Sequence, residues 1–66
     1  MLEFCQTVLA RVSFDRRLFA KELKKSYAWL SLEDAEALKR WALKTYSHKY
    51  SQLIVTTFSA VYGMKS

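Results

Sequence analysis

Proline is absent from the 66-residue chain, and glycine occurs only once, at Gly63. These two residues interrupt helices more strongly than any others, so a chain that almost lacks them favours helical structure along its whole length. Apolar residues also recur at helical spacing, which defines one buried face per helix. In the first part of the chain they are Leu2, Cys5, Val8, Leu9 and Val12. Since a chain of this length has room for one domain, the sequence predicts a single all-helical domain over residues 1–66.

Two helix starts have clear local signals. Asp15 is a good N-cap, because its carboxylate accepts hydrogen bonds from the free N–H groups of the next turn, and it predicts a second helix over residues 16–30. Phe14 and Phe19 flank this cap at the spacing of a hydrophobic staple, in which the two side chains pack together. Ser31 begins the third helix in the same way. The short turn between the second and third helices implies an antiparallel pair.

The last third of the chain leaves two questions open. Residues 54–58 are rich in β-branched side chains, which favour strands. They do not alternate in polarity and have no second strand to pair with, so we favour a helix that is capped by Gly63. Ser47 is an acceptable N-cap for a fourth helix. The apolar stripe nevertheless continues unbroken from Ala35 to Val61.

The main prediction for the fold is a small antiparallel bundle of four short helices. The alternative is three helices, of which the C-terminal one is a rod of roughly 45 Å at 1.5 Å per residue. Two short helices are too small to cover such a rod, so the alternative demands a dimer.

Few residues are available for chemistry. Cys5 is the only cysteine and His48 the only histidine, so the chain has no internal disulfide and too few ligands for a closed zinc site. Cys5 lies on an apolar helix face, where a thiol is usually inert, and no third group orients a Cys–His pair. Glu22 flanks the apolar face of the second helix, and we expect it to pair with Lys39 of the third. The sequence predicts a protein that is not an enzyme and that has no cofactor, metal or small-molecule substrate.

The chain also lacks the features of an exported or membrane-spanning protein. No run approaches the roughly 20 apolar residues that a membrane span needs, and the first ten residues have no positive leader before their apolar stretch. A lone thiol fits a reducing compartment. We therefore expect a cytoplasmic protein without a membrane partner.

Charge gives the first indication of a partner. The formal net charge is +5, and four cations share the outer face of the second helix at 100° per residue, with no acid among them. These residues are Arg17, Lys21, Lys24 and Lys25. One interpretation is a solvated face that keeps a hydrophobic domain in solution. The other is a surface that contacts a polyanion such as a phosphate backbone, without reading sequence, because the face has no Asn or Gln to recognise bases.

Excess apolar surface gives the second indication. The chain is 52% hydrophobic, and a domain of this size buries only about 60% of the surface that its unfolded chain exposes. The segment from Tyr50 to Met64 carries no charge. One interpretation wraps this segment centrally with the other helices, and the other uses it, with a nearby tryptophan, as a homodimer interface. The interface residues that we predict are Trp41, Val55, Phe58 and Tyr62.

The leading functional hypothesis is a small non-enzymatic interaction module that self-associates or binds another protein. The alternative is a small basic protein that associates with nucleic acid through phosphate contacts. The two hypotheses differ in the surface that binds, which is apolar in the first and the basic face of the second helix in the other.

Overall fold

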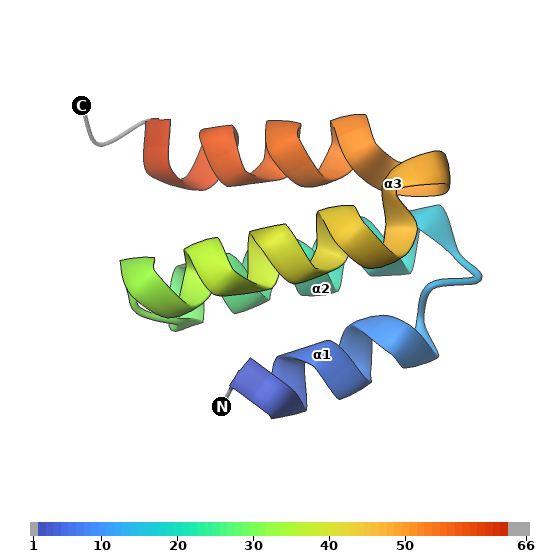
Figure 1. The fold of residues 1–66 in the computed structure, drawn as a ribbon, viewed down its shortest axis with the longest axis horizontal. Coiled ribbons are helices and arrows are strands. Elements are labelled where there is room, and N and C mark those ends of the chain that lie inside the picture. The colour runs from blue at the N-terminus through green and yellow to red at the C-terminus, as the bar shows by residue number, and fades with distance from the viewer. Residues whose placement is uncertain (1, 64–66) are drawn as a thin grey trace.

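The computed structural model describes residues 2–63, which form three helices (Figure 1). Helix α1 covers Leu2–Arg11, α2 covers Arg16–Trp29 and α3 covers Leu32–Tyr62. Within the described range no residue belongs to a strand, and residues 54–58 are helical despite their β-branched side chains. The all-helical prediction is therefore confirmed.

Helix α3 contains a kink at which the chain reverses direction (Figure 1). Tyr46 and Tyr50 have non-helical φ/ψ angles of −122°, 24° and −131°, 18°. We call residues 32–45 the first limb of α3 and residues 51–62 the second limb. The limbs lie side by side, and the Nζ atom of Lys39 in the first limb is 4.4 Å from the ring centroid of Phe58 in the second.

This kink decides between the two predicted folds. The main prediction of four separate helices does not match the structure, whereas the alternative of three helices with a long C-terminal helix does. The straight rod of that alternative is wrong, because 31 residues would extend about 46 Å and the longest dimension of the fold is 32 Å. Since the second limb folds back, its apolar stripe is covered within one chain, and the geometric demand for a dimer disappears.

The N-caps predicted for the second and third helices are confirmed, whereas Ser47 lies inside α3 and begins no separate helix. The Asp15 carboxylate accepts hydrogen bonds from the backbone N–H groups of Arg17 at 2.9 Å and Leu18 at 3.3 Å. Ser31 Oγ accepts one from the N–H of Asp34 at 3.3 Å. Helix α2 consequently begins where it was predicted to begin and ends one residue earlier than predicted. Both starts were predictable because the cap and its N–H donors are neighbours in sequence.

The predicted hydrophobic staple is wrong. Phe14 is 75% exposed, whereas Phe19 is fully buried. Phe19 stacks on Tyr50 with ring centroids 4.4 Å apart and meets Tyr46 edge-on at 5.3 Å. A core contact with the kink of α3 thus replaces the local contact with Phe14.

The bundle has α2 and the first limb of α3 in the middle, α1 along one side and the second limb along the other (Figure 1). The second limb therefore lies at an edge, and the interpretation that places it centrally is wrong. Every element contributes to the buried core, which consists of Cys5, Leu9, Phe19, Leu23, Tyr27, Leu30, Ala35, Leu38, Ala42, Tyr50 and Ile54.

Candidate interaction surface between the first two helices

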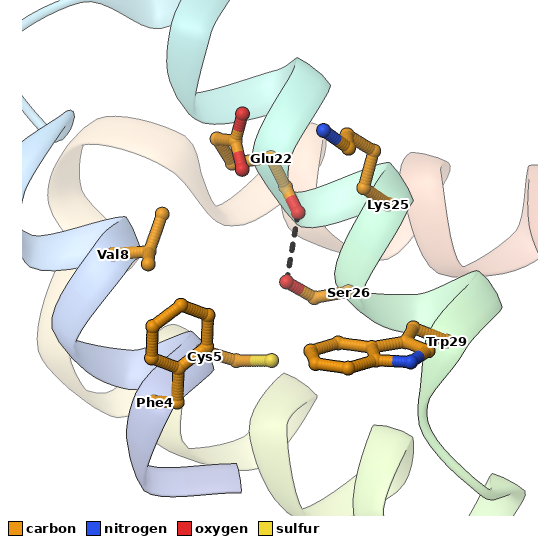
Figure 2. A pocket seen from close by; sticks show the side chains of 7 residues that line it. All are labelled: Phe4, Cys5, Val8, Glu22, Lys25, Ser26 and Trp29. Carbon is orange, nitrogen blue, oxygen red and sulfur yellow. Dashed lines mark hydrogen bonds between the residues drawn. The ribbon is translucent and has the colours of Figure 1, made fainter. Parts of the chain in front are cut away.

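Helices α1 and α2 run antiparallel, and a pocket of about 310 Å³ opens between them (Figures 1 and 2). Each helix contributes side chains at intervals of three or four residues, which places them on one side of that helix. The lining residues are Phe4, Cys5 and Val8 of α1 and Glu22, Lys25, Ser26 and Trp29 of α2. The pocket is open to solvent, so a side chain from another molecule has access to it.

Two exposed aromatic side chains form one end of this pocket. Phe4 is 60% exposed and Trp29 is 57% exposed. Their rings meet edge-on with centroids 6.4 Å apart, and Figure 2 shows them reaching toward one another from the two helices. Edge-to-face contact is a favourable aromatic geometry, but it leaves most of both rings in water. Large aromatic side chains left exposed together are unusual on a surface that binds nothing.

The floor and wall of the pocket combine apolar and polar groups. The free thiol of Cys5 is buried, and the hydroxyl of Ser26 donates to the Glu22 carbonyl at 2.8 Å within the helix (Figure 2). Ser26 therefore uses its donor inside α2. The Glu22 side chain is half-buried, and it forms no ion pair with any residue in the 2–63 range. The predicted pair with Lys39 is wrong, because the Lys39 ammonium lies over the Phe58 ring instead.

The predicted basic face borders this pocket. Arg17, Lys21, Lys24 and Lys25 are all exposed, and none of the four is ion-paired with another residue of the described chain. Lys25 belongs to both features, since it also lines the pocket. The apolar pocket and the four cations therefore form one continuous surface of α2.

The predicted homodimer residues have different surroundings. Trp41 is half-buried and meets Tyr46 edge-on at 5.7 Å, and Phe58 meets Tyr27 edge-on at 5.2 Å. The Tyr62 hydroxyl donates to the Tyr27 carbonyl at 2.7 Å. Val55 alone among the four predicted interface residues is exposed, at 43%. The structure thus places three of them in contacts within the chain and one at the surface.

Phe4 was not predicted as a site residue from the sequence, and neither was a pocket beside Glu22. Phe4 lies outside the stripe that defined the buried face of the first helix, and nothing local indicates which neighbour it meets. Antiparallel packing brings the start of α1 to the end of α2, and this pairs Phe4 with Trp29. The spacing of Phe4 and Val8 is the available signal, because it marks a second apolar edge on the first helix.

The residues considered for chemistry are not brought together. Cys5 is buried beside the pocket, whereas His48 is exposed in the kink of α3. In the described part of the chain, His, Cys, Asp and Glu side chains form no group of three or more that could hold a metal ion. None of the three helices, over the same residues, is long and apolar enough to cross a membrane.

Comparison with known proteins gives no relative from which a function could be transferred. No family model matches the sequence, and searches of curated proteins and of solved structures find no match. The function is therefore inferred from the surface between α1 and α2.

Proposed function

We propose that this chain is a small, non-enzymatic, cytoplasmic interaction module that binds another protein at the pocket between α1 and α2. The observation that carries this proposal is the pair of exposed aromatic side chains, Phe4 and Trp29, at one end of a pocket of about 310 Å³. Tryptophan is enriched among the residues that dominate binding energy at protein interfaces. A partner that covers both rings would gain on the order of 1 kcal/mol from each, because about half of each side chain remains to be buried.

The proposal is tested by cross-linking in the cells that produce the protein, followed by affinity purification with and without nuclease. We expect protein partners that survive nuclease and that disappear when Trp29→Ala is introduced. Leu32→Ala is the matched control, since Leu32 is 54% exposed and lies outside the pocket. Equal recovery of partners by the unmodified protein and Trp29→Ala would contradict the proposal.

A second candidate function is phosphate contact with nucleic acid through the basic face of α2. The observation that favours it is the exposure of all four cations without an ion-pair partner in residues 2–63. Binding of this kind should be weak, tolerant of sequence and steeply salt-dependent. We expect Lys21→Gln with Lys25→Gln to lower the salt slope by about one for each phosphate that the protein no longer neutralises. Titration of labelled RNA and duplex DNA measures this slope, and the absence of binding at low salt would exclude the candidate.

Self-association is a further mode that we propose for the module. Val55 sits on the outer side of the second limb, among exposed residues without charge, namely Gln52, Thr56 and Ser59. A second copy can approach this side without desolvating an ionised group, which would otherwise be costly.

A further inference from the structure

We propose that the occupant of the α1–α2 pocket is an acidic amphipathic helix of another protein. This inference rests on the proposed function, because it names the partner class for the same site. The spacing of the exposed apolar side chains supplies the shape argument, and the cations of α2 supply the charge argument.

The side chains that α2 presents beside the pocket are spaced for contact with a helix. Leu18, Glu22, Lys25 and Trp29 follow one another at intervals of four, three and four residues, so they lie on one side of α2. The first and the last of them are exposed apolar side chains, at 41% and 57%. Trp29 follows Leu18 by eleven positions, which is about 16 Å or three helical turns. A helix laid along this side therefore reaches both with apolar residues that recur every three or four positions.

The cations of α2 favour acidic residues beside the apolar stripe of the partner helix. Lys25 lies in the pocket wall, and Lys21 is one turn away on the side of α2 that faces solvent. Arg17 and Lys24 continue the same basic face. Acidic residues beside the apolar stripe of the partner would meet these unpaired cations. Their negative charge would also offset the like-charge repulsion among Arg17, Lys21 and Lys25, which are spaced four residues apart. Charge complementarity of this kind fixes the orientation of the partner and accelerates association.

Other occupants fit this surface less well. A second copy docked on the same side would bring two sets of four cations together, because a two-fold interface pairs a surface with itself. A lipid or nucleic-acid surface would bring phosphates against the half-buried carboxylate of Glu22, which lies between Leu18 and Lys25. A peptide helix avoids this conflict by placing a neutral or basic residue opposite Glu22 and its acidic residues opposite the lysines.

The test is a display selection on the intact protein. The probe is a library of helical peptides of about 16 residues, with the apolar and flanking positions randomised. Such a helix is about 24 Å long and so extends past both ends of the surface. We expect enrichment of apolar residues at intervals of three and four, flanked by Asp and Glu. Selected peptides are then synthesised, and their affinity is measured by fluorescence anisotropy at two salt concentrations.

Variants separate the contributions of the pocket and the basic face. Trp29→Ala should lower the affinity by about thirtyfold or more, as expected for a central aromatic contact. Lys25→Gln should lower it several-fold and reduce its salt dependence. Leu32→Ala and Lys44→Gln are matched controls outside the surface, and they should change the affinity by less than about twofold. Circular dichroism verifies that each variant is folded.

Three results would overturn the inference: no enrichment, enrichment without acidic residues, or binding that Trp29→Ala leaves unchanged. A parallel titration uses vesicles of phosphatidylcholine with and without phosphatidylserine. Trp29-dependent binding to the anionic vesicles would assign the surface to a membrane and would also overturn the inference. If cross-linking in cells finds Trp29-dependent protein partners while the selection fails, the proposed function stands and only the acidic helix is wrong.

Discussion

Tyrosine hydroxyls complete hydrogen bonds that the helices leave open. The last carbonyls of a helix have no partner within that helix. The Tyr62 hydroxyl donates to the Tyr27 carbonyl at 2.7 Å and, more weakly, to the Leu30 carbonyl at 3.5 Å at the end of α2. The Tyr50 hydroxyl likewise donates to the Ser13 carbonyl at 2.7 Å, in the turn that follows α1. These side chains from α3 therefore join the ends of both shorter helices to the long one.

Tyr27 gives the fold a pH dependence in the alkaline range. Burial, and then the nearby Tyr62 phenol, raise the pKa of Tyr27 well above its ordinary value of 10.0. The unfolded phenol loses its proton near pH 10, whereas the folded one keeps it. The contribution of the Tyr27 phenol to the free energy of unfolding is therefore complete below pH 10. As the pH rises above 10, this contribution declines by up to about 1.4 kcal/mol per pH unit.

Urea unfolding between about pH 8 and pH 11.5, a range that spans the ordinary tyrosine pKa, measures this effect. The informative quantity is the difference between the unmodified protein and Tyr27→Phe, because this difference isolates the Tyr27 phenol. That variant removes the phenol and sacrifices only a long hydrogen bond, of 3.4 Å, to the Ile54 carbonyl. Its stability should fall less steeply above pH 10. Identical slopes for the two proteins would contradict the assignment.

Predictability from sequence differs among residues for a physical reason. Asp15 and Ser31 cap helices through N–H groups two or three positions away, so sequence alone was sufficient. The exposure of Phe14 and the pairing of Phe4 with Trp29 depend on neighbours that are distant in the chain. The basic face of α2 was predictable, because helical spacing alone places its cations together.

Among the elements, α3 shows most clearly what helical periodicity leaves undetermined. The two breaks occur at Tyr46 and Tyr50, which are themselves members of the apolar stripe. Each limb keeps the stripe on its inner side, so the pattern looks continuous although the chain reverses. The segment between the breaks contains neither Gly nor Pro, which are the usual local signals of a turn. What does mark the kink is a contact distant in sequence, because Tyr46 and Tyr50 both pack against Phe19 of α2.

Phe19 is the side chain of α2 that packs against the kink. Its ring contacts both Tyr46 and Tyr50. Truncation of a buried phenylalanine costs about 3–5 kcal/mol, which is comparable to all that the core of so small a domain supplies. We therefore expect Phe19→Ala to lose most of its helical circular dichroism at room temperature.

Phe14→Ala is the matched control, because it removes the same atoms from an exposed position in the turn before α2. Its stability should change by no more than about 0.5 kcal/mol. If Phe19→Ala unfolded at the same urea concentration as the unmodified protein, the kink would not depend on this aromatic contact.

The two sides of the molecule differ in charge. The sequence predicted this difference, although it did not predict how the last helix folds back. Every charged residue of the described chain lies at or before Lys49, so the second limb is the uncharged edge of a basic bundle. Helical periodicity alone did not predict that the apolar side chains of the second limb would pack within the same chain. By folding back, the chain itself packs Trp41, Phe58 and Tyr62. Of the four predicted interface residues, only Val55 then remains exposed for self-association.

Self-association through the second limb should accordingly be weak. Val55 is 43% exposed, and one valine surrounded by small polar residues supplies little apolar area for a dimer interface. We expect a concentration-dependent rise in mass in sedimentation equilibrium at high micromolar concentration. Val55→Glu should abolish this rise, because a dimer would have to bury an unpaired carboxylate on each copy. Leu18→Glu, which puts the same charge at a similarly exposed apolar position of α2, should leave the rise unchanged. If the unmodified protein stays monomeric at all concentrations, the dimer is excluded. If both Glu variants lose the rise in mass, the loss is caused by the added charge and not by the position of Val55.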